Sequence, residues 1–257
     1  MTLDKWIPFR NEGAGVRCRL FAFPHAAGNT AIYRPLRSLM PPDIDLCPVE
    51  LPGRAARVDE LPLSSMNSLM ERLNHVLQPL MTVPFGFFGH SVGAWTAFEA
   101  ARQLRAADGR TAVHLFVSGR NSPKRASAGS SQARLPLSNE DLLSILLRFG
   151  GTPSEVLQRP ELMAVLLPAL RADLALIEGY SVEPGHRIAC RITAFGGSDD
   201  VSHSGLLQSW GDFTLAKFRS CIFRGGHFYF SCAAGALARE IVEDMRASAS
   251  RHAATVG

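Results

Sequence analysis

Residues 89–93 read Gly89-His90-Ser91-Val92-Gly93, which is a Gly-x-Ser-x-Gly motif. A short apolar run at residues 85–88 precedes the motif, and a helix-like segment at residues 94–106 follows it. A strand, a sharp turn and a helix in this order form a nucleophile elbow, which lifts a serine hydroxyl clear of the sheet. A side chain at either glycine would crowd that turn. Because a hydroxyl is a poor nucleophile by itself, Ser91 needs a base, an acid and an oxyanion site elsewhere in the chain.

The composition predicts one globular domain with a full hydrophobic core. Of the 257 residues, 46% are hydrophobic and 19% are charged. No apolar run is long enough to span a bilayer, and residues 1–10 lack the pattern of a signal peptide. The 5 cysteines are scattered without CxxC spacing, which argues against a disulfide framework and a structural zinc. We therefore expect a cytoplasmic protein that binds no metal and no membrane.

The charge of the chain gives little reason to expect nucleic-acid binding. The net charge is +4, and the arginines are spread along the whole sequence. The nearest approach to a basic cluster, residues 120–134, lacks the interleaved aromatic residues of a single-strand binding face. An acidic protein partner fits this charge better than a nucleic acid does.

Strand-like and helix-like segments alternate along the chain. Compact apolar runs predict strands before the motif and at residues 19–23, 44–49, 113–117, 192–195 and 218–223. Apolar residues recur at helical spacing in residues 32–39, 66–80 and 234–247. This alternation predicts an α/β fold with a mostly parallel central sheet flanked by helices.

One long stretch interrupts the alternation. Between residues 122 and 185 no strand is predicted, whereas helices are expected at residues 139–149, 153–158 and 162–180. Ser138 can cap the first of these, with Asp141 at the third helical position. We expect a helical lid at about residues 122–185, inserted into a single domain at 1–257 whose core is residues 1–121 and 186–257.

His227 is the predicted catalytic base. In α/β-hydrolases the catalytic residues follow the order serine, acid, histidine, and the base lies on the loop after the last strand. Among the 8 histidines, His227 follows the last predicted strand directly, after two glycines that let the backbone turn. His203 is the nearest rival but lies in the loop expected to carry the acid, and the alternative role for His227 is that of a surface histidine.

Two adjacent carboxylates, Asp199 and Asp200, follow the predicted strand at residues 192–195. Because successive residues point in different directions, only one of them can meet Nδ1 of His227. We expect this to be Asp199, with Asp200 capping the next helix or facing water. The acid would hold the imidazole in the productive tautomer and stabilise the imidazolium.

The oxyanion hole needs two backbone N–H groups. Val92 supplies one of them, as the residue after the nucleophile. The loop at residues 23–28 follows the first strand and is rich in small residues, which let the backbone approach a carbonyl oxygen. We expect Ala26 to be the second donor, and His25 to brace the loop through hydrogen bonds rather than to take part in catalysis.

Several motifs together resemble one protein family over nearly the whole chain. They are Phe23-Pro24-His25-Ala26-Ala27-Gly28, Tyr33-Arg34-Pro35-Leu36, Leu51-Pro52-Gly53-Arg54, Phe88-Gly89-His90-Ser91-Val92-Gly93-Ala94, His114-Leu115-Phe116-Val117-Ser118-Gly119-Arg120, Gly150-Gly151-Thr152-Pro153, Leu167-Pro168-Ala169-Leu170-Arg171-Ala172-Asp173, Glu178-Gly179-Tyr180 and Gly225-Gly226-His227-Phe228. The chain resembles the type II thioesterases that accompany modular polyketide synthases and nonribosomal peptide synthetases. Many hydrolases share the elbow, but the loop and lid segments are far more specific.

The resemblance implies hydrolysis of acyl thioesters on the phosphopantetheine arm of acyl or peptidyl carrier proteins, which clears stalled or incorrect acyl groups. The enzyme itself needs no cofactor for this, and we expect a monomer. The family usually reads Gly-Asp-x-Asp with the second Asp catalytic, which implies Asp199. Here Gly197 stands at the usual first Asp and the segment after Asp199 is one residue shorter, so Asp200 stays the alternative.

Other functions fit the same residues. A carboxylesterase-like hydrolase would act on oxygen esters, and a product-releasing thioesterase is usually fused to a synthase, whereas no carrier-protein segment is attached here. A binding protein that has lost catalysis is a third alternative, against which the set of Ser91, Asp199 and His227 argues. The apolar residues of the lid are expected mainly to pack the lid onto the body and in part to line an acyl chamber; they include Leu143, Leu146, Leu147, Phe149, Leu166 and Leu170.

Overall fold

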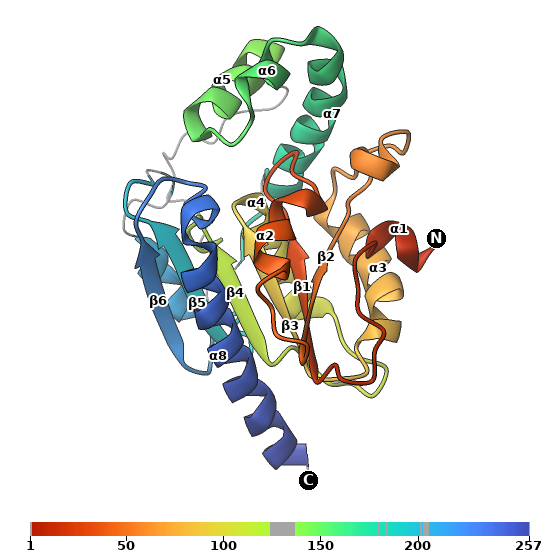
Figure 1. The fold of residues 1–257 in the computed structure, drawn as a ribbon, viewed down its shortest axis with the longest axis vertical. Coiled ribbons are helices and arrows are strands. Elements are labelled where there is room, and N and C mark those ends of the chain that lie inside the picture. The colour runs from red at the N-terminus through yellow and green to blue at the C-terminus, as the bar shows by residue number, and fades with distance from the viewer. Residues whose placement is uncertain are drawn as a thin grey trace.

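A computed structural model of the chain describes residues 2–123, 137–178, 180–182, 185–200, 202 and 206–256. Its centre is a sheet of 6 strands in the order β2-β1-β3-β4-β5-β6, with every neighbouring pair parallel (Figure 1). The strands are β1 (Cys18–Phe23), β2 (Ile44–Pro48), β3 (Phe85–His90), β4 (His114–Ser118), β5 (Arg191–Gly197) and β6 (Phe218–Phe223). The predicted α/β fold with a parallel sheet is therefore confirmed.

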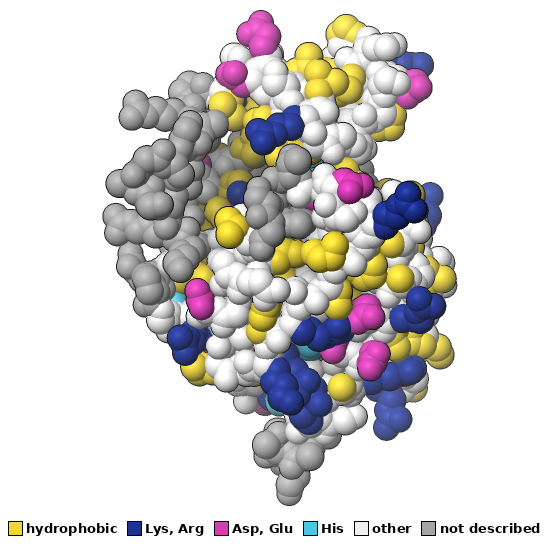
Figure 2. All heavy atoms as spheres, turned by 90° about the vertical axis from the view of Figure 1, so that its left-hand side faces the viewer, with side chains coloured by type: hydrophobic (Ala, Val, Ile, Leu, Met, Phe, Trp, Pro, Cys, Tyr) yellow, Lys and Arg dark blue, Asp and Glu magenta, His cyan; other side chains and the backbone are white. Residues whose placement is uncertain are grey.

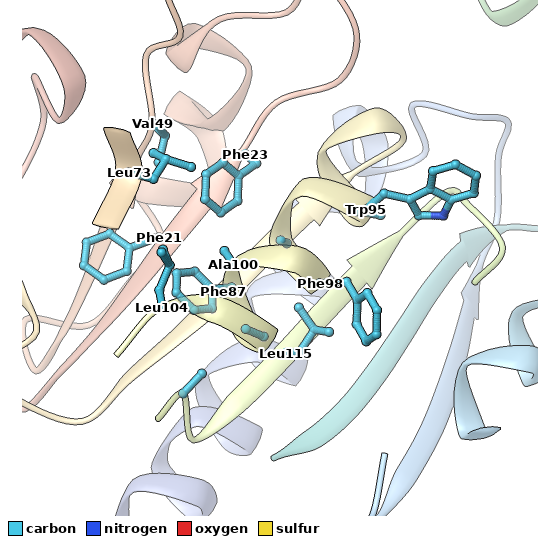
Figure 3. Close-up of a cluster of buried hydrophobic side chains, with 14 of the residues drawn as sticks. Phe21, Phe23, Val49, Leu73, Phe87, Trp95, Phe98, Ala100, Leu104 and Leu115 are labelled. Atoms are coloured by element: carbon cyan, nitrogen blue, oxygen red, sulfur yellow. The ribbon is translucent and has the colours of Figure 1, made fainter. Parts of the chain in front are cut away.

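The sheet is buried on both faces because successive side chains of a strand point to opposite sides. Phe21 and Phe23 of β1 lie in one hydrophobic cluster, and the alternate residues Leu20 and Ala22 lie in another. Figure 3 shows the first cluster, in which Phe21, Phe87 and Leu115 from neighbouring strands meet Phe98 and Ala100 of helix α4 (Val92–Gln103). The second cluster includes residues of helix α8 (Phe230–Val256).

The helices of the core are α1 (Leu3–Trp6), α2 (Arg34–Arg37), α3 (Met66–Leu77), α4 (Val92–Gln103) and α8 (Phe230–Val256). Short 3₁₀ segments join them, namely η1 (Thr30–Tyr33), η2 (Ala55–Arg57), η3 (Gln78–Leu80) and η4 (Leu206–Phe213). The helix predicted at residues 66–80 ends at Leu77, where the 3₁₀ turn that contains Pro79 takes over. The last helix runs past the predicted end at residue 247, and the non-helical backbone of Ala233 separates it from a short helical turn that begins at Phe230.

Among the described residues between β4 and β5, three helices occur: α5 (Asn139–Phe149), α6 (Ser154–Leu157) and α7 (Pro160–Ile177). They stand at the top of the molecule in Figure 1, beyond one end of the sheet. The predicted cap is present, because Ser138 Oγ accepts the Asp141 N–H and the Asp141 carboxylate accepts the Ser138 N–H. Residues 124–136 of the expected lid lie outside the described residues.

The surface of this helical insertion carries exposed apolar side chains. Leu147 is 63% exposed, and Leu162 and Val165 are 40% and 46% exposed. Figure 2 shows hydrophobic side chains among acidic and basic ones on the upper part of the molecule, and all three kinds also occur over the lower part of the same face. Within the described residues, no helix combines the length and the apolar character needed to cross a membrane.

Candidate active site

Ser91 occupies the sharp turn between β3 and α4. Its φ of 56° and ψ of −119° are rare for a residue other than glycine, and such strain is typical of functional turns. A Cβ on Gly89 would lie 1.9 Å from the Gly93 carbonyl oxygen, and a Cβ on Gly93 would lie 2.3 Å from that of Phe23. The expected need for glycine at both positions is confirmed. Of residues 89–93, Ser91 alone is not buried.

His227 lies in the loop after β6, beside the elbow. Its ring centroid is 4.7 Å from that of His90, the residue that precedes Ser91. A Cβ on Gly119, at the end of β4, would approach both the His90 and the His227 rings. The hydrogen bonds of His227 to described residues are made by Nδ1, and none joins Nε2 to Ser91.

The structure corrects the predicted acid, because Asp200 and not Asp199 lies against His227. Asp200 Oδ2 is 2.9 Å from Nδ1 of His227, and the two side chains are 1% and 6% exposed. Asp199 is exposed, and its carboxylate accepts a hydrogen bond from Ser198 Oγ. A carboxylate in this position can orient an imidazole for catalysis, and Asp200 occupies it.

The correction has its physical cause in the length of β5. The strand runs to Gly197, two residues past the predicted end at residue 195, so the turn falls on Ser198 and Asp199. The Asp199 N–H then donates to the Gly225 carbonyl at 2.9 Å, which fixes this residue in the turn. Asp200 is the next residue, and its side chain points into the protein.

Ser202 joins the site, although the sequence analysis did not single it out. Its Oγ donates to the Gly119 carbonyl at 3.0 Å and lies 3.2 Å from Nδ1 of His227. Its backbone N–H donates to Asp200 Oδ1 at 2.9 Å. An aspartate that accepts from the N–H two residues later is a common local turn, and that spacing is the signal that could have drawn attention to Ser202.

These hydrogen bonds keep Asp200 ionised. Burial by itself opposes the charge, but the bonds from His227 and Ser202 outweigh it, so the pKa of Asp200 lies below its usual value. A proton on Nδ1 of His227 satisfies both Asp200 and Ser202, which leaves Nε2 as the basic nitrogen. The arrangement therefore favours the tautomer that general-base catalysis by Nε2 requires.

Two other histidines lie close to His227 and stay neutral. Burial, together with the nearby His227 and Arg54 charges, lowers the pKa of His25 to about 3. Burial and the same histidine lower the pKa of His90 well below its ordinary value. His25 Nδ1 has no hydrogen-bond partner, so the expected bracing does not use this atom, and the ring packs instead edge-on against Phe228 at 4.8 Å.

The two expected oxyanion donors are backbone N–H groups without a partner among the described residues. The N–H of Val92 begins α4, and that of Ala26 lies in the loop after β1. The loop packs directly on the elbow, because Gly93 approaches the carbonyl oxygens of Phe23 and Pro24. The next two N–H groups of the loop are both used, that of Ala27 by Asp173 and that of Gly28 by the His25 carbonyl.

The helical insertion touches the catalytic loops. The Phe149 ring lies 5.0 Å from that of His227, and a Cβ on Gly151 would lie 2.3 Å from Phe228. Leu146 and Leu170 are buried with Leu142 in a small cluster against which Ala26, Ala27 and Leu166 pack. Of the six named lid residues, Leu146, Leu166 and Leu170 belong to this packing cluster, Leu147 is exposed, and Phe149 is in ring contact with His227.

The chain is similar to known thioesterases along most of its length. The family model described as "Thioesterase domain" matches residues 18–247. Gramicidin S biosynthesis protein GrsT of Aneurinibacillus migulanus is 37% identical over 229 residues, which cover 88% of each chain. Thioesterase PikA5 of Streptomyces venezuelae is 31% identical over 88% of this chain and 80% of its own length.

A solved structure agrees with these relatives. The type II thioesterase BorB from the borrelidin biosynthetic cluster superposes with a TM-score of 0.83 at 33% identity, over 95% of this chain and 99% of BorB. Family match, sequence identity and fold point the same way: the chain belongs to the thioesterase domain family of serine hydrolases.

Proposed function

We propose that the protein is a type II thioesterase that hydrolyses acyl thioesters on the phosphopantetheine arm of acyl or peptidyl carrier proteins. The observation that carries the proposal is the Asp200–His227 pair beside the strained Ser91 elbow, in a chain of the thioesterase family. The similarity to BorB, a type II thioesterase, supports the narrower assignment. By removing stalled or aberrant acyl groups, such an enzyme would keep a polyketide or nonribosomal peptide synthase working.

The proposed acylation step begins when Ser91 Oγ attacks the carbonyl carbon of the thioester and Nε2 of His227 takes the hydroxyl proton. The oxyanion of the tetrahedral intermediate accepts hydrogen bonds from the N–H groups of Val92 and Ala26. The carbon–sulfur bond then breaks, and the pantetheine sulfur leaves with the proton from His227. Asp200 stabilises the imidazolium while it holds this proton.

Deacylation repeats the same chemistry with water. His227 takes a proton from a water molecule, which attacks the acyl-serine ester. The ester bond to Ser91 then breaks, His227 returns the proton to Ser91 Oγ, and a carboxylic acid is released. His25 and His90 help by remaining neutral, because a second positive charge next to His227 would oppose formation of the imidazolium.

The helical insertion fits the role of a lid in this scheme. Phe149 of α5 covers one side of His227, and the exposed apolar side chains of α5 and α7 offer surface for an acyl chain or a carrier protein. A closed aromatic cover excludes water from the charges that develop during the reaction.

The substrate class is tested by comparing acetyl carrier protein, acetyl-pantetheine and p-nitrophenyl acetate by kcat/KM. The proposal predicts that the carrier-bound thioester is the best substrate, by roughly a hundredfold or more over the free ester, because the carrier adds binding energy that the ester lacks. A carboxylesterase would instead prefer the free ester and leave the acyl carrier protein intact, and that result would overturn the proposal.

A further inference from the structure

Asp173 of α7 and Arg54, in the loop between β2 and η2, form a buried ion pair between the helical insertion and the body of the protein. The guanidinium meets the carboxylate in a fork, with Nη1 to Oδ2 at 2.6 Å and Nη2 to Oδ1 at 2.8 Å. The side chain of Arg54 is 5% exposed and that of Asp173 is 2% exposed. Because both charges are costly to remove from water, such a pair depends on good geometry and on further hydrogen bonds.

Two further hydrogen bonds join the pair to the loop after β1, and Arg54 Nε also donates to the Pro52 carbonyl at 3.4 Å. Asp173 Oδ2 accepts the N–H of Ala27 at 2.7 Å, and Arg54 Nη1 donates to the Gly28 carbonyl at 3.1 Å. Ala27 has a φ of 57°, a region that residues other than glycine seldom adopt. The ion pair therefore stabilises a backbone conformation that an alanine would not adopt by itself.

These contacts also use some of the backbone N–H groups of the loop after β1, which therefore cannot donate to an oxyanion. Asp173 occupies the N–H of Ala27, and the His25 carbonyl occupies that of Gly28 at 2.9 Å. The N–H groups of His25 and Ala26 have no partner among the described residues, and Ala26 is the one adjacent to Ala27. A peptide rotation at Ala27 would change the direction of this group, and the carboxylate of Asp173 opposes that rotation.

We propose that Asp173 and Arg54 are positioning residues for the oxyanion hole, through which helix α7 of the insertion is coupled to the reactivity of Ser91. The inference rests on the proposed function and deepens it. Neither residue touches the reacting atoms; both act through the backbone of the loop that carries Ala26. The lid would then control catalysis by holding this loop as well as by covering the site.

The test uses the full chain with Asp173→Asn and, separately, Arg54→Lys. The first change keeps the shape of the side chain but removes its charge, and the second keeps the charge but loses the fork. We expect kcat on acetyl carrier protein, per active site titrated to completion with a fluorophosphonate, to fall roughly tenfold to a hundredfold, with KM within about threefold of wild type.

A second readout reports on the oxyanion hole itself. A trifluoromethyl ketone forms a tetrahedral adduct with a catalytic serine, and its inhibition constant should rise in parallel with the fall in kcat. A purely structural role would lower the melting temperature and the titratable fraction but leave kcat per site and the inhibition constant unchanged. If Asp173→Asn does not fold, Arg54→Lys, which retains the ion pair, still tests the positioning role through kcat per site and the inhibition constant.

Asp45→Asn is the matched control. Asp45 has a side chain that is 2% exposed, and it also accepts from an arginine, Arg19, at 3.3 Å and from a backbone N–H, that of Asn11, at 3.0 Å. It lies near the start of β2, away from the carboxyl ends of the strands where Ser91 and His227 lie. We expect this variant to lose stability while kcat per titrated site stays at the wild-type value.

The outcomes separate the two proposals. Wild-type kcat per site and wild-type ketone affinity in both variants would overturn the positioning role. A wild-type protein that forms the ketone adduct but leaves acyl carrier proteins intact would overturn the proposed substrate class, and the ketone affinities would still decide the role of Asp173 and Arg54.

Discussion

Nδ1 of His227 lies 2.9 Å from Oδ2 of Asp200, whereas the adjacent Asp199 turns its carboxylate to Ser198 at the surface. This relationship makes a direct prediction about two neighbouring residues. Asp200→Asn should lower kcat/KM by roughly a hundredfold to ten-thousandfold, because the imidazole loses the partner that sets its tautomer and stabilises its charge. Asp199→Asn is the matched control and should stay within about twofold of wild type.

The kinetic measurement is hydrolysis of acetyl carrier protein by both variants under identical conditions. A large loss in Asp199→Asn with little change in Asp200→Asn would show that the acid lies one residue earlier than the geometry indicates.

The space around two helical glycines predicts opposite effects of Gly→Ala on the free energy of unfolding. Gly93 belongs to the elbow, and Gly235 lies in α8. Gly235→Ala in α8 meets no atom within 4 Å and should stabilise the fold by roughly 0.5–1 kcal/mol. Gly93→Ala places its Cβ 2.3 Å from the Phe23 carbonyl oxygen and should destabilise by about 1–3 kcal/mol. Urea unfolding measures both changes, and a stabilising Gly93→Ala would contradict the packing described here.

The contact between Phe149 and His227 predicts that the lid contributes to turnover. Phe149→Ala removes the ring that lies 5.0 Å from the His227 ring and opens this side of the site to water. We expect kcat/KM on acetyl carrier protein to fall roughly threefold to tenfold. Ser144→Ala, at an exposed polar position of the same helix, serves as the control and should behave like wild type. Equal activities for all three proteins would show that α5 does not act on His227.

A buried histidine away from the site predicts how stability depends on pH. His114 is held by Ser248 and Thr193 at 2.9 Å each, and burial lowers its pKa to about 4. Between pH 4 and the ordinary histidine value near 6.5, the unfolded chain binds a proton that the folded protein does not. Stability therefore falls as the pH drops through this window, by up to about 1.4 kcal/mol per pH unit for this group.

Urea unfolding of wild type and His114→Gln between pH 4.5 and 7 tests whether His114 causes this acid sensitivity. The free energy of unfolding of the variant should change less with pH than that of wild type, whatever its value at pH 7. Identical slopes would exclude His114 as a source of the acid sensitivity.

The strands and the elbow could be read from the sequence because their signals are local. Strands β1 to β5 are short, mainly apolar segments with most side chains buried, β6 is partly buried, and the glycines at 89 and 93 follow from the space around one turn. The short elements α1 (Leu3–Trp6) and η4 (Leu206–Phe213) were not predicted, since α1 is shorter than two helical turns and η4 does not repeat with the 3.6-residue period of an α-helix.

Two features of the site could not be predicted from local sequence patterns. Ser91 and His227 were placed by motif and order, but the choice between two adjacent aspartates depended on where β5 ends, and strand ends are poorly marked in a sequence. The pair of Arg54 and Asp173 joins residues 119 positions apart, and no local pattern connects them. Only the fold reveals that both contact the loop of Ala26.

The central claim is that Ser91 attacks a thioester delivered by a carrier protein, and Ser91→Ala tests it most directly. Wild type and variant are incubated with acetyl carrier protein, and release of the free pantetheine thiol is followed by intact-protein mass spectrometry. The account predicts rapid release by wild type and a rate at least about a thousandfold lower for the variant, with its fold intact by circular dichroism. A folded Ser91→Ala protein that releases the thiol at the wild-type rate would contradict the account.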